Sequence, residues 1–412
     1  MEVLFKPCAG SDVHRDSVTA TARVPGKGRR RREQQTRTFG ATISQLEALA
    51  DWLSGFGVTL VGMEATGVYW KPVFNVLEPR GFTCWLLNAQ HLHHVPGRKT
   101  DVIDSAWTCE IVELGLLRPS FVPPPEIRRR RGLTRLRTRQ VEERTRTIQR
   151  LEKVLQDAGI KLTSVASGVY SVSARAMLEA LLGGTSDPQA LAELARGRMR
   201  AKIPQLREAL RSSFRLDHHG VLLAQLLARI NSLELALSTL DARIEAALAP
   251  MAELVEPICT IPGVERRTAQ VLIAECGIDM SVFPTVAQLV SWAGICPGNN
   301  QSGGKRRSGK TRHGSAWLRT ALTEAAKAAR ARGAHLAAHQ AQIRGRRGEP
   351  KAIGATSHDL LVACHRIVHE RVPLRELGAD RLARRHSIEH RTRRLVRQLE
   401  ALGPKVAVEP AA

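Results

Sequence analysis

The sequence lacks the cysteine spacing of a disulfide framework or a zinc ribbon. Its seven cysteines stand at positions 8, 84, 109, 259, 276, 296 and 364, an odd number with no Cys-x-x-Cys pair. Disulfide frameworks and zinc ribbons need paired or closely spaced thiols, so the pattern argues against both. Scattered, unpaired cysteines are typical of a reducing compartment, and we therefore expect a cytoplasmic protein.

The sequence also lacks a signal peptide, a long apolar run and an internal repeat. Its first ten residues, MEVLFKPCAG, are too short and too polar for a secretory signal. No apolar run approaches the ~20 residues that a membrane-spanning helix needs. The sequence therefore predicts no association with a membrane.

Acidic residues are few relative to basic ones. The chain of 412 residues has 39 Asp and Glu against 62 Lys and Arg, a net charge of +23. A field of this sign attracts a polyanion, most commonly nucleic acid. Ribosomal proteins are also basic, but they are usually shorter and poorer in apolar residues, which make up 43% of this chain. The composition predicts a globular nucleic-acid-binding protein of two or three domains.

The first 118 residues have the pattern of an α/β fold. Strands are predicted at 17–24, 58–61 and 82–87, and helices at about 44–53, 67–80 and 100–116. The sequence Ser44-Gln-Leu-Glu47 has the spacing of a capping box, which predicts the start of the first helix. Strands that alternate with helices indicate a sheet covered by helical layers.

A helical region follows the proline-rich linker Pro119–Pro125. A basic helix is predicted at about 127–158, and a second helix at about 216–248 has a heptad repeat. The repeat predicts a coiled coil, either with the first helix folded back antiparallel or between two molecules. In the antiparallel case, residues 160–215 form a small helical insertion. The two core positions of the heptad are Leu223, Ile230, Leu237 and Ile244, and Leu226, Leu233 and Leu240.

The chain therefore divides into four predicted regions. These are an α/β domain at 1–118, a basic coiled-coil segment with its insertion at 126–250, a compact third domain at 251–335 and a basic helical tail at 340–412.

Four carboxylates stand at positions that suit a metal site in the first domain. Asp12 follows a short apolar start, Glu64 follows a buried strand, and Asp101 and Asp104 lie three apart at the start of a helix. Residues three apart share one helix face. Hard oxygen ligands at one edge of a sheet suit two Mg²⁺ ions in phosphodiester chemistry. Each acid alone is more often a cap or a turn residue; four in this order are a rarer coincidence.

The third domain begins with a helix, a Pro-Gly turn and a second helix over Ile258–Ala274. This pattern resembles a helix-hairpin-helix motif that contacts the DNA backbone, and the alternative is an ordinary corner between two helices. A loop rich in Gly, Asn and Ser follows, with Ser302 before two glycines. By composition alone it is a flexible basic loop. Its cations are Lys305, Arg306, Arg307, Lys310 and Arg312.

These motifs together resemble the DEDD transposases of insertion sequences. The N-terminal matches are Asp12-Val13, Gly62-Met-Glu-Ala-Thr-Gly67 and Arg98-Lys-Thr-Asp-Val-Ile-Asp-Ser105. The C-terminal matches are Pro262-Gly-Val264, Ala293-Gly-Ile-Cys-Pro297, Ser302-Gly-Gly-Lys305 and Leu318-Arg-Thr-Ala-Leu322. The family pattern differs around Asp12, where Ser11 occupies a usually apolar position and Arg15 stands where a Lys is expected.

The resemblance implies a fold and a mechanism. The first domain would be RNase H-like (RuvC-like), with Asp12, Glu64, Asp101 and Asp104 as ligands of Mg²⁺ or Mn²⁺. Ser302 would form a covalent link to a DNA phosphate, with Ser308 and Ser315 as further candidates. A structured guide (bridge) RNA would select the DNA, and the enzyme would act in the bacterial cytoplasm, in association with the nucleoid.

Two further expectations concern partners. The cluster Arg128, Arg129, Arg130 and Arg131 on the basic helix is a candidate face for DNA or RNA. The acids and Ser302 are far apart in sequence, which favours a homo-oligomer, a dimer or tetramer, in which they meet. Two alternatives stay open: a metal-dependent junction-resolving nuclease without a covalent intermediate, and a non-catalytic nucleic-acid binder.

Overall fold

The computed structural model describes most of the chain, in two compact units, Met1–Pro123 (unit 1) and Pro124–Ala412 (unit 2). The described residues are 3–26, 32–65, 67–88, 101–297, 300–311, 313–332, 334–375, 388–403 and 405–408. At 101–103, 300–302, 306–308, 334, 388–391 and 394 only the backbone is described.

Unit 1 is built on a mixed five-stranded sheet with the order β3-β2-β1-β4-β5. The strands are β1 (Cys8–Val13), β2 (Ser17–Pro25), β3 (Arg32–Gly40), β4 (Leu60–Glu64) and β5 (Thr83–Leu87). The first three strands pair antiparallel, and β4 and β5 add to β1 in parallel. This arrangement is compatible with the expected RNase H-like start. The sequence pattern did not predict β3, because it is an edge strand whose side chains are mostly exposed and polar.

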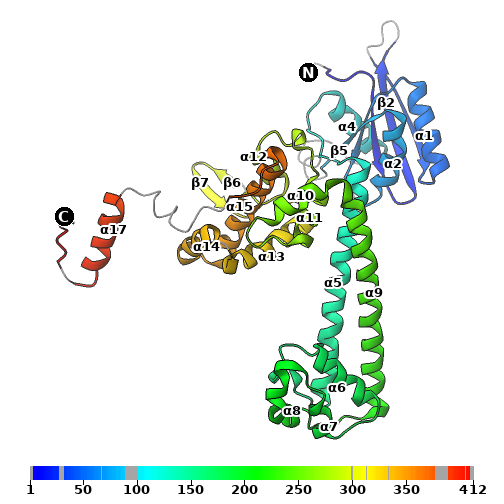
Figure 1. Ribbon diagram of the computed structural model, residues 1–412. Helices are drawn as coiled ribbons and strands as arrows, with labels where there is room; N and C mark the ends of the chain where they lie inside the picture. Colours follow the sequence, from blue (N-terminus) through cyan, green and yellow to red (C-terminus); the bar gives the residue numbers. More distant parts are fainter. Residues whose placement is uncertain are drawn as a thin grey trace. The chain divides into compact units, whose positions relative to one another are not determined.

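Helices cover both faces of this sheet (Figure 1). On one face, α1 (Ile43–Gly55) and α2 (Trp70–Leu77), which continues into η1 (Glu78–Arg80), pack on the larger hydrophobic core. On the other face, α4 (Asp101–Glu113) packs on a smaller core. The predicted capping box is wrong in one respect: α1 begins at Ile43, before Ser44, and its N-cap Thr42 makes no side-chain cap hydrogen bond.

Unit 2 begins with two long antiparallel helices, α5 (Pro125–Asp157) and α9 (Val221–Leu248), which lie side by side in Figure 1. Two ion pairs join the helices, Arg137 with Asp241 and Arg144 with Glu234. The later residue of α5 pairs with the earlier residue of α9, as antiparallel helices require. Of the seven heptad leucines and isoleucines, Leu223, Ile230, Leu233 and Ile244 are buried. The intervening elements are η2 (Leu162–Ser164), α6 (Val172–Leu182), α7 (Pro188–Glu193), η3 (Gly197–Lys202), α8 (Ile203–Ala209) and η4 (Leu216–Gly220).

The rest of unit 2 is mostly helical. Its elements are η5 (Ala249–Met251), α10 (Ala252–Cys259), α11 (Arg266–Cys276), η6 (Met280–Val282), α12 (Val286–Trp292), β6 (Asn300–Ser302), β7 (Lys305–Ser308), α13 (Ala316–Arg332), α14 (Ala334–Arg347), α15 (Glu349–Glu370) and α17 (Ile388–Glu400).

A buried carboxylate ties α5 to this helical region. Glu275 is fully buried, and Arg135 of α5 donates to both of its oxygens, at 2.7 and 2.9 Å. The hydroxyl of Ser315 donates to the same carboxylate at 3.0 Å and caps α13 by accepting from the Leu318 N–H. Because a buried charge is costly without partners, this network fixes α5, α11 and α13 to one another.

One segment corrects the expectation about apolar runs. Leu216–Cys259, which contains α9, is long and apolar enough to cross a membrane by length and composition alone. The core helix of a soluble protein has the same length and composition. Within the segment, Glu234 and Asp241 form ion pairs with α5, which are contacts of a protein interface rather than of a lipid-facing helix.

Candidate functional site

A Gly-x-acid pattern on two neighbouring strands positions the first two predicted carboxylates. Gly10 on β1 pairs with Gly62 on β4, and Asp12 and Glu64 each follow two residues later. Successive side chains of a strand point to opposite faces, so each acid lies on the same face as its glycine. That face is the one covered by α4, since a Cβ on Gly10 would collide with the backbone of Ser105 and Cys109.

The direction of α4 places its first turn at the same end of the sheet. Cys8, at the start of β1, contacts Cys109 of α4, and Gly10, further along the strand, also lies against Ser105, one turn earlier in the helix. Helix α4 therefore runs antiparallel to β1. Asp104 directly precedes Ser105, and Asp101 lies one turn earlier. We name Asp12, Glu64 and the first turn of α4 the acid edge. The side chain of Asp101 lies outside the described residues; the backbone positions of the four acids share this edge.

The two residues that depart from the family pattern around Asp12 have contacts of their own. Ser11 is buried on the opposite face, where its hydroxyl donates to the Gly62 carbonyl at 3.1 Å and ties β1 to β4. Arg15 pairs with its exposed neighbour Asp16. Asp12 instead has a hydrogen bond with His14, whose Nε2 lies 3.0 Å from a carboxylate oxygen. Sequence reasoning missed His14, which directly follows β1 and belongs to no recognised motif.

The predicted nucleophile Ser302 and the cations that follow it lie in unit 2, on a short hairpin. β6 and β7 pair antiparallel, with Ser302 opposite Lys305 across Gly303-Gly304. Both glycines have positive φ, +54° and +75°, as a two-residue type I′ turn requires. Ser302 therefore stands directly before the turn. Lys305 and Lys310 are exposed, Arg312 lies outside the described residues, and of Arg306, Arg307 and Ser308 only the backbone on β7 is described.

The root of this hairpin is closed tightly. A Cβ on Gly314 would collide with the Ala293 backbone, and Pro297 forms an isolated β-bridge with Thr311. Arg319 of α13 also donates to the Gly294 carbonyl at 3.2 Å. We name residues 294–314 the serine hairpin. Its two ends meet on the helical core, so the segment with Ser302 projects from a fixed base.

Contacts distinguish among the other predicted residues. The Ser315 hydroxyl is engaged by Glu275 and by the cap of α13, which makes it a poor nucleophile. Among the arginines of the basic helix, Arg129 is exposed, whereas the Arg131 side chain is 12% exposed, pairs with Glu275 and stacks on Trp292. Burial lowers the pKa of Arg131. Its first role is therefore structural.

The Pro-Gly turn between α10 and α11 is also packed inside unit 2. Gly263 has φ +83°, and a Cβ there would collide with the backbone of α13 at Ala325 and Ala329. Arg266 in the first turn of α11 forms ion pairs with Glu245 and Glu256. The turn thus serves contacts within the unit.

One other group of described residues has metal-ligand chemistry. Ligand atoms of Asp157, His218 and His219 all lie within 4.8 Å of one another, between the end of α5 and the start of α9. The His219 Nδ1 accepts a hydrogen bond from the Arg215 N–H, so its Nε2 carries the proton and donates to Asp157 at 3.2 Å. With both ring nitrogens in use, His219 joins the two helices rather than offering a lone pair to a metal.

Comparisons with known proteins match both regions. A family model of DEDD transposases of the IS110 kind matches residues 9–160, which contain all four acids. A second model, described as the transposase IS116/IS110/IS902 family, matches residues 255–341, which contain the serine hairpin. A probable family 20 transposase of Pseudomonas aeruginosa is 26% identical over 273 residues, covering 65% of this chain and 70% of that protein.

Proposed function

The chain belongs to the IS110 family of DEDD transposases, and we propose that it recombines DNA with a serine nucleophile and a carboxylate-bound metal. Transposases cut and rejoin DNA, which makes DNA the substrate and a divalent metal ion the expected cofactor. The finer mechanism is supported by one observation: the repeated Gly-x-acid pattern puts Asp12 and Glu64 at one sheet edge, where α4 begins.

The acid edge offers a donor set that fits a hard divalent cation. Asp12 and Glu64 lie on one face of adjacent strands, and Asp104 lies at the start of the helix that covers this face. Carboxylate oxygens are the preferred ligands of Mg²⁺ and Mn²⁺, which supply Lewis-acid stabilisation of a phosphate when bound. His14 orients Asp12 through its hydrogen bond, and the close packing of α4 on Gly10 keeps the edge rigid.

The serine hairpin carries the nucleophile in this proposal. The Ser302 oxygen forms a bond to a DNA phosphorus as its hydroxyl loses a proton, the bond from phosphorus to one sugar oxygen breaks, and that oxygen takes up a proton. The phosphoserine ester retains the bond energy until a sugar hydroxyl of another strand attacks it and releases the serine. Lys305, opposite Ser302 in the hairpin, and the cations that follow it favour the approach of the phosphate.

The test is a trapped covalent intermediate. We expect a nicked DNA substrate to yield a protein–DNA adduct that survives denaturation, and Ser302→Ala to abolish both the adduct and recombination. Ser308→Ala is the matched control, since it removes the same hydroxyl from the facing strand of the hairpin. An adduct that persists in Ser302→Ala contradicts the assignment of the nucleophile. Metal-dependent cleavage by the wild type without any adduct supports the junction-nuclease alternative instead.

Two partner proposals accompany this mechanism. The acids belong to unit 1 and Ser302 to unit 2, and we propose that they combine between subunits of a dimer or tetramer. Mixing Glu64→Gln protein with Ser302→Ala protein should then restore activity that neither variant has alone.

We also propose that a structured RNA selects the DNA. Ribonuclease treatment of the purified complex should abolish recombination while leaving the protein intact.

A further inference from the structure

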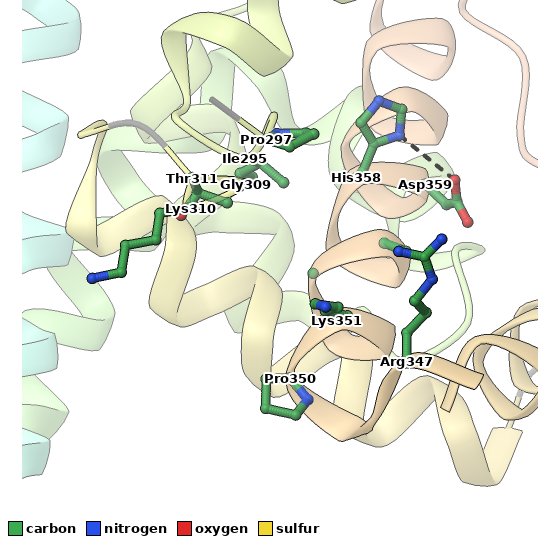
Figure 2. Close-up of a pocket in the computed structure, with 12 residues that line it drawn as sticks. Ile295, Pro297, Gly309, Lys310, Thr311, Arg347, Pro350, Lys351, His358 and Asp359 are labelled. Carbon is green, nitrogen blue, oxygen red and sulfur yellow. Dashed lines mark ion pairs between the residues drawn. The ribbon is translucent and has the colours of Figure 1, made fainter. Parts of the chain in front are cut away.

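A cavity of about 920 Å³ lies at the root of the serine hairpin, within unit 2 (Figure 2). Both sides of the hairpin contribute to it, Ile295 and Pro297 before the strands and Gly309 to Thr311 after them. The opposite wall is the end of α14 and one face of α15, from Pro350 to Asp359. The volume is at the upper end of the range for ligand-binding pockets.

The lining combines an apolar floor with positive charge. Arg347 and Lys351 are exposed at the cavity, and within the described chain neither forms an ion pair or a side-chain hydrogen bond. Lys310 lies on the hairpin side of the cavity, and its side chain points away from α15 in Figure 2. Arg347 and Lys351 beside an apolar hollow suit a ligand with an anionic group and a flat, weakly polar body.

A carboxylate gives the cavity a polarity along α15. Asp359 accepts from His339 Nδ1 at 2.9 Å and lies 3.6 Å from His358 Nδ1. It stands eight residues after Lys351, about 12 Å along a helix that rises 1.5 Å per residue. An anion is therefore favoured near Lys351 and repelled near Asp359, which accepts hydrogen bonds from a donor such as an exocyclic amino group.

We propose that this cavity binds an unpaired nucleotide of the DNA strand that Ser302 attacks, with its phosphate near Arg347 and Lys351 and its base toward Asp359. The inference rests on the proposed function of Ser302. Ser302 lies on β6 of the hairpin whose base lines the cavity, so a strand that brings a phosphate to Ser302 passes close to it.

Gly354 provides a way to fill the cavity without disturbing the fold. It lines the cavity within α15, and a Cβ at this position meets no atom within 4 Å. Gly354→Leu should therefore occupy the hollow, and it replaces a poor helix former by a good one. Gly354→Ala is the matched control, because it adds one methyl group and leaves most of the space open.

The experiment uses the full chain carrying Ser302→Ala, so that no covalent adduct forms. A short single-stranded oligodeoxynucleotide with photoreactive 4-thiothymine is crosslinked to it, and the attached peptides are identified by mass spectrometry. We expect crosslinks in residues 309–311 or in α15. Gly354→Leu should reduce their yield at least about fivefold, as expected for loss of the stacking and contacts of one nucleotide. Gly354→Ala should reduce it less than about twofold. Unchanged melting temperatures confirm that the variants fold.

A charge comparison adds an independent arm. Arg347→Gln with Lys351→Gln should weaken oligodeoxynucleotide binding about tenfold, as expected for lost contacts to a charged group. Arg346→Gln, at the neighbouring position outside the cavity, should change binding by less than about twofold. Crosslinks that map elsewhere, or that survive Gly354→Leu, overturn the proposal. So does capture of an RNA oligonucleotide here in place of DNA. None of these results depends on whether wild-type Ser302 forms an adduct.

Discussion

The acid edge and the serine hairpin hold their proposed catalytic groups in opposite ways. At the acid edge, Gly10 and Gly62 lie so close to α4 that any side chain on them would collide with it. In the serine hairpin, Gly303 and Gly304 have open space around them, and turn geometry alone requires them to be glycine. The acids are therefore positioned by packing over a buried face, whereas Ser302 is positioned by a tight turn on a closed root.

This difference has a chemical counterpart. Metal ligands need a fixed mutual geometry, which a packed sheet edge provides. A nucleophile that must reach a DNA phosphate needs an exposed position, which a hairpin provides. The two regions should consequently respond differently to substitution. Substitutions at the acid edge should lower both the stability of the fold and the catalytic rate, whereas substitutions in the hairpin should lower mainly the catalytic rate.

The largest effect is expected from the acids themselves. Glu64→Gln or Asp101→Asn removes a carboxylate that would hold the metal ion, and with it the positive charge that would stabilise the transferring phosphate, so strand cleavage should fall at least about a hundredfold. DNA binding should stay nearly unchanged, because the binding cations are untouched. Cleavage of a labelled substrate in Mg²⁺, beside a mobility-shift titration, measures both quantities. Full recombination by both variants contradicts the metal-site assignment.

The next largest effect tests the root of the hairpin. Glu275→Ala leaves Arg135 and Arg131 without their buried partner, which should lower the free energy of unfolding by about 3–5 kcal/mol. Denaturation followed by tryptophan fluorescence suits this variant, since Trp292 stacks on Arg131. Glu256→Ala, which breaks an exposed pair with Arg266, should cost less than about 1 kcal/mol. Equal costs for the two variants are incompatible with a buried network.

A pair of glycine variants compares the two regions directly. Gly10→Ala places a methyl group against the Ser105 and Cys109 backbone, so unfolding should become easier by about 1–3 kcal/mol, with loss of cleavage. Gly304→Ala only forces a positive φ and should cost about 1 kcal/mol. Thermal unfolding of both proteins measures the difference. If Gly304→Ala is less stable than Gly10→Ala, the proposed difference between the two regions is wrong.

The smallest effect concerns nucleic-acid affinity. Arg129→Gln removes one exposed cation of α5, and the slope of log affinity against log salt should fall by at most about 1. Arg131→Gln should act mainly on stability, because its guanidinium lies inside unit 2. Binding titrations over a range of salt, with RNA and with DNA, distinguish the two. An unchanged slope for Arg129→Gln identifies this part of α5 as a solvated face.

Much of the molecule follows from local spacing in the sequence. The family was predicted from the resemblance of short motifs to the DEDD transposases. The alternation of strands and helices before residue 118 and the two long helices that follow were predicted from periodicity. The Gly-x-acid spacing around Asp12 and Glu64 is of the same kind, since side-chain alternation along a strand fixes the face of each acid.

Only the tertiary structure decided the contacts between distant segments. The polar strand β3, the burial of Arg131 against Glu275 and the choice of His14 rather than Arg15 as the partner of Asp12 carry no periodic pattern. The cavity between the hairpin root and α15 likewise joins segments about fifty residues apart. Such features depend on which surfaces come into contact after the chain folds. The spacing of residues along one helix or strand does not predict those contacts.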